Sequence, residues 1–132
     1  MGEVDIRDLI GKPFVYGGKG EKGWDCFTLS REVLHRAGIE IPQQETLRNM
    51  IFQALEFKNQ VENYYIELDK PEPWCTVAFR IKSKDITHMG VVLEDCTRFI
   101  HVMYHRNVLV EDLSFPYWEQ HIKGFYRYVG KD

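Results

Sequence analysis

The sequence lacks the features that mark membrane proteins and exported proteins. No run of apolar residues approaches the ~20 that a membrane-spanning helix needs. The segment from Met1 to Asp5 carries two acids where a signal peptide carries basic residues, and no apolar segment follows it. Ile6 stands where a myristoylation motif has Ser or Thr. We therefore expect synthesis in the cytoplasm without a signal peptide, and no membrane span.

Cysteine is scarce, and an excess of basic residues is absent. Cys26, Cys75 and Cys96 are an odd number at wide spacing, which fits neither a disulfide framework nor a paired-cysteine metal site. Lys and Arg number 17 against 20 Asp and Glu, scattered along the chain, whereas nucleic-acid-binding proteins usually have a basic face. These features indicate a reduced protein without a nucleic-acid partner, in which one cysteine can be reactive.

The residues that are present suffice for one core, with helices first and strands later. Hydrophobic residues make up 44% of the 132, and no repeat or linker divides the chain, so we expect a single domain over residues 1–132. Asp25 is a typical helix N-cap, and Gly38 and Pro42 end the apolar helical spacing that follows it. The same spacing predicts a second helix over residues 45–57.

The apolar period changes to two after Pro71 and Pro73, which indicates strands. A short helical turn is expected over residues 114–121. The expected strands are residues 76–81, 87–93, 98–104, 108–113 and 125–129. Helices followed by consecutive strands predict an α+β fold, with N-terminal helices packed on an antiparallel sheet of about five strands.

The spacing Gly18-x-Gly20-x-x-Gly23 matches a dinucleotide-binding fingerprint, but its surroundings do not. Asp25 would place a carboxylate at the helix N-terminus, where a pyrophosphate would have to bind. The next convincing strand is about fifty residues further on, too far for a parallel β-α-β unit. We interpret the glycines as a surface turn and expect no nucleotide cofactor.

Cys26 directly follows the expected N-cap, so its sulfur lies in the first turn of the helix. Free backbone N–H groups and the positive end of the helix dipole favour a thiolate there. The alternative interpretation is a small buried hydrophobic residue, which is the usual role of a lone cysteine. Cys75 and Cys96 lack such a setting and are expected to be structural.

A thiolate nucleophile needs an imidazole base and a polar group that orients the base. His88 and His101 lie in consecutive expected strands. A two-residue turn at Glu94-Asp95 would pair them directly, a four-residue turn would leave them diagonal on one face, and an odd-length loop would separate them. We expect a base and its orienting partner, although either histidine taken alone is more often a surface or core residue.

Metal binding has little support in the sequence. His101 and His105 would be roughly 13 Å apart along a strand, too far to share an ion. No carboxylate or cysteine stands at ligand spacing beside His88. His35 and His121 are expected to be structural, and we expect no metal site.

Taken together, these segments resemble the NlpC-type cell-wall peptidases, a branch of the papain-like cysteine peptidases. The resemblance covers nearly the whole chain, with the segments in the family's order and spacing. They are GKPFVYGG at 11–18, DC at 25–26, GIEIP at 38–42, THMGVVL at 87–93 and FIH at 99–101.

The resemblance implies a papain-like fold and hydrolysis of the D-γ-glutamyl-diamino acid bond in peptidoglycan stem peptides, through a thioester. By position, Cys26 is the nucleophile, His88 the general base and His101 the orienting third residue. Tyr16 matches the tyrosine beside the nucleophile, and Asp25 matches the family's Asp before Cys. The resemblance also implies that the backbone N–H of Cys26 helps to hold the oxyanion, with no cofactor.

The chain also departs from the family pattern. Phe27-Thr28 replaces the usual Ser-Gly after the nucleophile, and Cys75-Thr76 replaces a Gly-Asp before the first strand. A bulky residue after the cysteine resembles variants from phage tails and prophages, which implies tail proteins as partners and a virion location. The alternative functions are a non-catalytic assembly or binding module of this fold, and a cysteine amidase or acyltransferase on another substrate.

Overall fold

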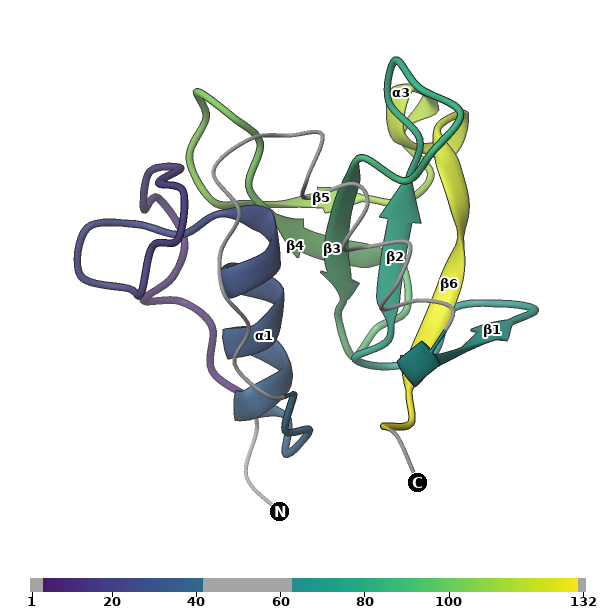
Figure 1. Cartoon of the computed structure of the whole chain (residues 1–132), viewed down its shortest axis with the longest axis horizontal. Coiled ribbons are helices and arrows are strands. Elements are labelled where there is room, and N and C mark those ends of the chain that lie inside the picture. The colour runs from purple at the N-terminus through teal and green to yellow at the C-terminus, as the bar shows by residue number, and fades with distance from the viewer. Residues whose placement is uncertain (1–3, 42–62, 131–132) are drawn as a thin grey trace.

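The computed structural model describes residues 4–41 and 63–130 (Figure 1). The helix expected over residues 45–57 lies outside these residues. Among the described residues, no helix is long and apolar enough to cross a membrane. The elements, in chain order, are α1 (Cys26–Arg36), β1 (Tyr65–Leu68), β2 (Thr76–Phe79), β3 (His88–Val92), β4 (Arg98–His101), β5 (Leu109–Asp112), α3 (Pro116–Glu119) and β6 (Ile122–Tyr128).

The strands form one antiparallel sheet in the order β1-β6-β2-β3-β4-β5. The predicted α+β class and antiparallel sheet are therefore confirmed. The described sheet has six strands where we expected about five, because β1 was not predicted. Burial does not alternate along it, because Tyr65 is buried while both Ile66 and Glu67 are exposed, and β1 pairs only with β6, which returns from the far end of the chain.

Helix α1 forms where Asp25 and Gly38 predicted its limits. Gly38 has a φ of +88°, the left-handed conformation that suits glycine at a helix end. The Gly38 N–H donates to His35 O and the Ile39 N–H to Leu34 O, which completes a Schellman cap. The buried residues of the helix recur every three or four positions, so they share one face. They are Cys26, Leu29, Ser30, Val33 and Leu34.

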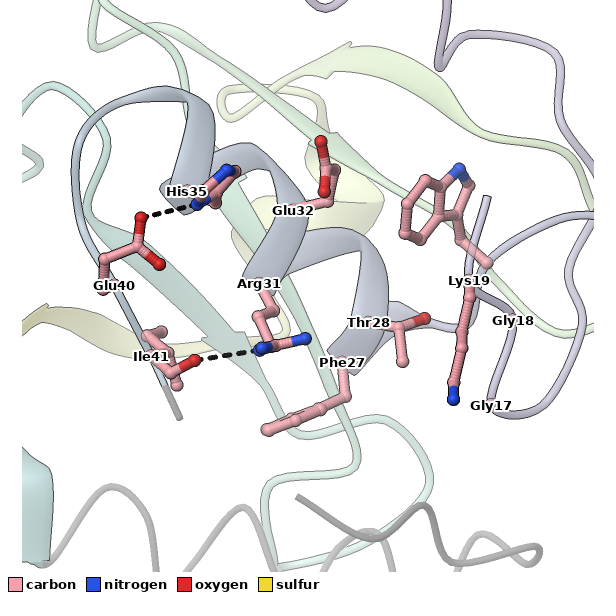
Figure 2. A pocket seen from close by; sticks show the side chains of 11 residues that line it. Gly17, Gly18, Lys19, Phe27, Thr28, Arg31, Glu32, His35, Glu40 and Ile41 are labelled. Carbon is pink, nitrogen blue, oxygen red and sulfur yellow. Dashed lines mark hydrogen bonds and ion pairs between the residues drawn. The ribbon is translucent and has the colours of Figure 1, made fainter. Parts of the chain in front are cut away.

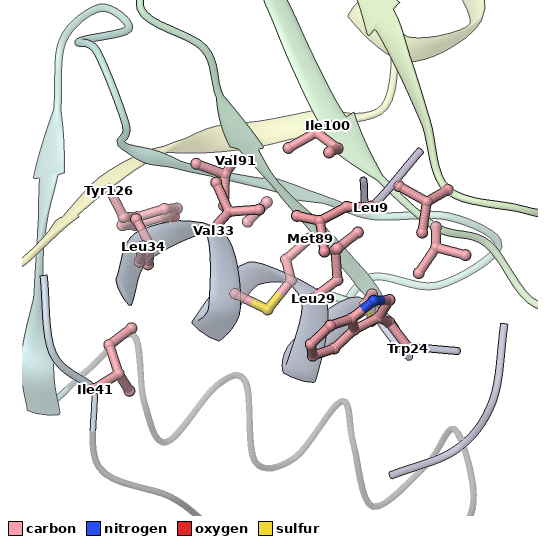
Figure 3. Close-up of a cluster of buried hydrophobic side chains, with 14 of the residues drawn as sticks. Leu9, Trp24, Leu29, Val33, Leu34, Ile41, Met89, Val91, Ile100 and Tyr126 are labelled. Carbon is pink, nitrogen blue, oxygen red and sulfur yellow. The ribbon is translucent and has the colours of Figure 1, made fainter. Parts of the chain in front are cut away.

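That face of α1 packs mainly against β3 and forms the larger core (Figure 3). Leu29 and Val33 meet Met89 and Val91, all 6% exposed or less. Because neighbouring residues of a strand face opposite sides, Val92 belongs to a second core on the other face of the sheet. This second core also holds Phe79, Phe99 and Trp118, the last of them from α3.

The β3–β4 hairpin decides where the two strand histidines lie. Val92 pairs with Phe99, and the Leu93 N–H donates to Arg98 O, which leaves a four-residue loop over residues 94–97. The two-residue turn therefore does not form, and His88 and His101 occupy diagonal positions on one face. Both lie on the face of the second core. His88 is the first residue of β3 and His101 the last of β4, and α1 begins near the same end of β3 (Figure 1).

Candidate active site

Cys26 is held by the cap of α1. The Asp25 carboxylate, fully buried, accepts hydrogen bonds from the Thr28 N–H at 2.7 Å and the Gly17 N–H at 2.8 Å. In return, the Thr28 hydroxyl oxygen accepts the Asp25 N–H at 3.0 Å, which completes a capping box. Asp25 thereby fixes both the first turn of the helix and the segment that precedes it.

The segment before the cap places Tyr16 beside the cysteine. The Trp24 N–H donates to Pro13 O, and the Val15 N–H donates to Trp24 O.

The same loop has no room for side chains at two of its glycines. A Cβ at Gly23 would lie 2.2 Å from Pro13 O, and one at Gly18 would lie 2.1 Å from Gly23 O. The spacing of the glycines is therefore explained by close contacts within the loop.

Cys26, Tyr16 and His88 line one cavity of about 340 Å³. Its wall on the Tyr16 side is aromatic: the Tyr16 ring centroid lies 4.9 Å from that of Phe14 and 5.7 Å from that of Tyr104. Tyr104 is half exposed and stands at the rim. Burial raises the pKa of the Tyr16 hydroxyl, which therefore stays protonated at neutral pH.

The Cys26 side chain is 4% exposed, and burial dominates its ionisation. Burial, with the negative charge of Asp25 second, raises the pKa of the thiol to about 12. The backbone N–H group of Met89 in β3 acts in the opposite direction, as do those of Cys26 and Phe27 at the helix N-terminus, but all three are outweighed. The resting group is thus a neutral thiol that needs a base.

The two strand histidines form a chain of hydrogen bonds behind the cavity. His88 Nε2 lies 2.8 Å from His101 Nδ1, and His101 Nε2 lies 2.6 Å from Glu111 Oε2. His88 is 4% exposed and His101 is 1% exposed. Only His88 of the two lines the cavity that contains Cys26. The geometry therefore suits His88 as the base and His101 as the group that orients it.

Aromatic rings hold both imidazoles in place. The Trp118 ring centroid lies 4.7 Å from that of His101 at an interplanar angle of 84°, and the Phe79 centroid lies 5.5 Å from that of His88. Burial lowers the pKa of His88 well below 6.5, with His101 adding to the effect. The pKa of His101 is also lowered by burial, although Glu111 opposes this. Both rings are therefore neutral near pH 7, as a base must be.

Glu111 is the member of this site that the sequence analysis missed. It lies in β5 and pairs with Phe99, so its side chain is on the same face as His101. One feature of the sequence could have pointed to Glu111. It is an acid within the expected strand 108–113, which directly follows the strand that carries His101. Without the register of three strands, that acid reads as an ordinary solvent-facing residue.

The other histidines and cysteines are not among the residues that line the cavity. His35 contacts Glu40 at 2.5 Å, His121 Nδ1 contacts Tyr117 O, and the His105 ring lies on that of Tyr104. Cys75 and Cys96 do not line the cavity either. Within the described ranges, no group of three potential metal ligands lies together.

A second pocket of about 340 Å³ lies on the outer side of α1, and Figure 2 shows the residues that line it. The glycine loop, represented by Gly17 and Lys19, forms one wall, and Phe27 and Thr28 form another. The Arg31 guanidinium donates to Ile41 O there at 2.8 Å. Phe27 thus lines this pocket and is not among the residues that line the Cys26 cavity.

Comparison with solved structures shows the same fold. A lipoprotein-like NLP/P60 family protein from Staphylococcus aureus has a TM-score of 0.63 at 23% identity, and an NlpC/P60 family protein from Bacillus cereus has 0.63 at 19%. The match covers 98% and 97% of this chain but only 44% and 41% of those proteins. The NlpC/P60 domain of the peptidoglycan hydrolase SagA has a TM-score of 0.54 at 20% identity, covering 91% of this chain and 89% of that domain.

The sequence comparisons give a family but no individual relative. No curated protein gives a significant match. The model of the NlpC/P60 family matches residues 11–127, which include Tyr16, Cys26, His88 and His101. This range also contains Glu111. The resemblance noted from the sequence is therefore confirmed: the chain belongs to the NlpC/P60 family.

Proposed function

We propose that the chain is a cysteine hydrolase that cleaves an amide bond in peptidoglycan stem peptides, of the D-γ-glutamyl-diamino acid type. The observation that carries this proposal is one cavity lined by Cys26 and His88, with His101 bound to the far side of the His88 ring. Family membership supports it, as does the shared fold with a domain of a peptidoglycan hydrolase.

The first half of the reaction forms a thioester. His88 takes the proton of the Cys26 thiol as the sulfur attacks the carbonyl carbon of the substrate amide. The carbonyl oxygen becomes an oxyanion, which the backbone N–H of Cys26 helps to stabilise. When this intermediate collapses, the C–N bond breaks and His88 returns the proton to the leaving amine nitrogen.

The second half restores the enzyme. A water molecule gives a proton to His88 and attacks the thioester carbonyl carbon. The C–S bond then breaks, the acid product leaves, and the cysteine sulfur recovers its proton. Because the pKa of Cys26 is raised and that of His88 is lowered, the pair begins each cycle neutral, and proton transfer accompanies the attack.

Tyr16 and Asp25 have different parts in this proposal. The Tyr16 ring lines the cavity beside Cys26, and in this proposal it contacts the substrate. Asp25 acts on the substrate indirectly, because its two carboxylate oxygens are already bonded to Thr28 and Gly17.

The Phe27-Thr28 pair after the nucleophile is the basis for extending the proposal to a phage-tail enzyme.

The test is hydrolysis of a synthetic L-alanyl-γ-D-glutamyl-diamino acid peptide, followed by mass spectrometry. Wild-type protein should release the diamino acid portion, and Cys26→Ala should abolish release without loss of the folded circular dichroism spectrum. Cys96→Ser, a thiol outside the cavity, is the matched control and should retain turnover. Turnover by Cys26→Ala would contradict the mechanism.

The two alternative functions give other outcomes of the same experiment. If Cys26 forms an acyl adduct with other amide or ester substrates but not with the stem peptide, the protein is a cysteine amidase or acyltransferase that acts on a different substrate class. If the folded protein forms no adduct with any of these substrates, the result favours a non-catalytic assembly or binding module.

A further inference from the structure

Glu111 ends the hydrogen-bonded chain that begins at the cavity. Its carboxylate accepts the His101 Nε2–H at 2.6 Å, and its side chain is 26% exposed while that of His101 is 1% exposed. It also accepts a hydrogen bond from Trp118, whose ring packs against His101. Resting on the proposed function, we propose that Glu111 is a positioning residue that fixes the tautomers of both histidines and so leaves a lone pair on His88 Nδ1 for the Cys26 proton.

The tautomers follow from the order of donors and acceptors. A carboxylate only accepts hydrogen bonds, so His101 Nε2 carries a hydrogen. In a neutral imidazole the other nitrogen is then an acceptor, so His101 Nδ1 accepts from His88 Nε2. His88 Nε2 therefore carries its hydrogen, and His88 Nδ1 has the free lone pair.

Without Glu111 the same two rings can bond in the reverse direction. His101 Nδ1–H would then donate to His88 Nε2, and the hydrogen of His88 would sit on Nδ1. A ring with its hydrogen there cannot take a proton from Cys26. The His88–His101 distance of 2.8 Å fits either direction, so the pair alone does not choose between them. Glu111 supplies the choice.

The groups that face Glu111 favour its ionised form. They are His101 from β4, Trp118 from α3 and Arg106 from the loop between β4 and β5. The hydrogen bond from His101 is the largest cause that lowers the pKa of Glu111, followed by that from Trp118, and the charge of Arg106 adds to them. Two donors, from His101 and Trp118, thus meet one carboxylate.

This pair of donors makes Glu111→Gln a sharp probe. A glutamine has an acceptor oxygen on one side and a donor NH₂ on the other, so when its oxygen turns to the Trp118 N–H, its NH₂ turns to His101 Nε2 and donates there. Removing the Trp118 donor by Trp118→Phe frees the amide oxygen for His101. The double variant Glu111→Gln with Trp118→Phe should therefore recover the histidine tautomers and the turnover that Glu111→Gln loses. A variant that had lost activity through poorer packing would not be rescued by removing a second side chain.

Two measurements test the proposal. Long-range ¹H–¹⁵N NMR should find both histidines protonated on Nε2 in the wild type and in the double variant, and on Nδ1 in Glu111→Gln. The kcat for peptide hydrolysis should fall about 10- to 100-fold in Glu111→Gln with KM nearly unchanged, and should recover in the double variant. Asp112→Asn, the exposed neighbouring acid on β5, is the matched control and should change neither.

A double-mutant cycle shows whether Glu111 acts through His101. In a His101→Asn background, Glu111→Gln should lower kcat less than about 2-fold, because the relayed partner is gone. An undiminished loss in that background would overturn the proposal, as would unchanged tautomers in Glu111→Gln. If Glu111→Gln alone does not fold, the double variant is compared with the single variant Trp118→Phe. Trp118→Phe keeps Glu111, so reversed tautomers in that variant would overturn the proposal.

Failure here can be told apart from failure of the proposed function. The NMR measurement needs no substrate, so reversed tautomers in Glu111→Gln support Glu111 even if the wild type cleaves no peptide. Peptide hydrolysis by a Glu111→Gln variant at the wild-type rate, with unchanged tautomers, would leave the proposed function standing and remove Glu111 from it.

Discussion

His88 and His101 bond through their rings at 2.8 Å although they are not directly opposite each other in the sheet. The residue opposite His101 is Gly90, two positions beyond His88. A Cβ on Gly90 would lie 3.1 Å from the His101 Cβ and 2.8 Å from Ile100 O. The missing side chain therefore lets the two diagonal histidines approach each other, and it makes Gly90 part of the construction of the site.

Gly90→Ala should accordingly destabilise the protein and displace His101. Overpacking in a filled interior costs about 1–3 kcal/mol, and the neighbours here are a backbone oxygen, a Cβ and the fully buried Phe99 ring, which cannot move aside easily. We expect a lower free energy of unfolding in urea and loss of most hydrolysis. Gly124→Ala in β6, whose near contacts are ends of the Glu67 and Tyr126 side chains, is the control. An equal loss of activity in both variants would contradict this role.

Asp25→Asn should have opposite effects on stability and on thiol ionisation. The amide keeps one acceptor oxygen, so one of the bonds from Thr28 and Gly17 is lost, and a buried donor left unpaired costs about 1–3 kcal/mol. The Asp25 charge raises the pKa of Cys26, so its removal should lower that pKa. Alkylation by iodoacetamide at pH 8 to 9 should therefore be faster per folded molecule, as read by mass spectrometry.

Thr28→Val is the companion variant, because it weakens the same cap without changing charge. It should lower the free energy of unfolding, whereas its Cys26 alkylation rate should stay near that of the wild type. If both variants alkylate equally fast, local opening of the helix start explains the result and the charge of Asp25 does not.

Stability should fall as the pH drops below 6.5 because His88 and His101 are buried. Their folded pKa values are lowered, so below pH 6.5 the unfolded chain binds protons that the folded protein does not. Unfolding then becomes more favourable with falling pH, by up to about 1.4 kcal/mol per pH unit for each group. Urea unfolding between pH 6.5 and about 5 measures the slope.

His88→Gln should make that slope shallower, whatever it does to stability at neutral pH. His105→Gln, at an exposed histidine, is the control for the general effect of charge. A slope in His88→Gln as steep as that of the wild type would mean that His88 takes up a proton in the folded protein.

Tyr104→Ala should weaken substrate binding more than it slows the chemistry. The ring is half exposed at the rim of the Cys26 cavity and packs on Phe14 and Tyr16. An aromatic contact contributes about 0.5–1.5 kcal/mol, so KM for the peptide should rise about 2- to 10-fold with kcat little changed. Phe115→Ala removes a similarly exposed ring that does not line the cavity. A matching rise in KM in that variant would remove Tyr104 from the binding surface.

Much of the site could be predicted from local sequence, because local interactions build it. A cap needs only Asp25 and the residues just after it, and a helix end needs only Gly38 and its neighbours, so the place of Cys26 was readable. Alternating apolar residues indicated β3 and β4, and hence two histidines on adjacent strands. The family segments in their order added the roles that we expect for Cys26, His88 and His101.

The tertiary structure decided what depends on register and on burial. Loop length set the diagonal between His88 and His101, and pairing of β4 with β5 brought Glu111 to His101; neither follows from periodicity, since a strand alternates equally well in any register. The sequence also predicted the direction in which the helix N-terminus acts on Cys26, but burial outweighs it, because the cost of desolvating a charge depends on everything packed around it. The sequence by itself thus determined the family and indicated the candidate nucleophile and the two candidate histidines, while only the packed sheet decided how these groups are joined and what charge they carry.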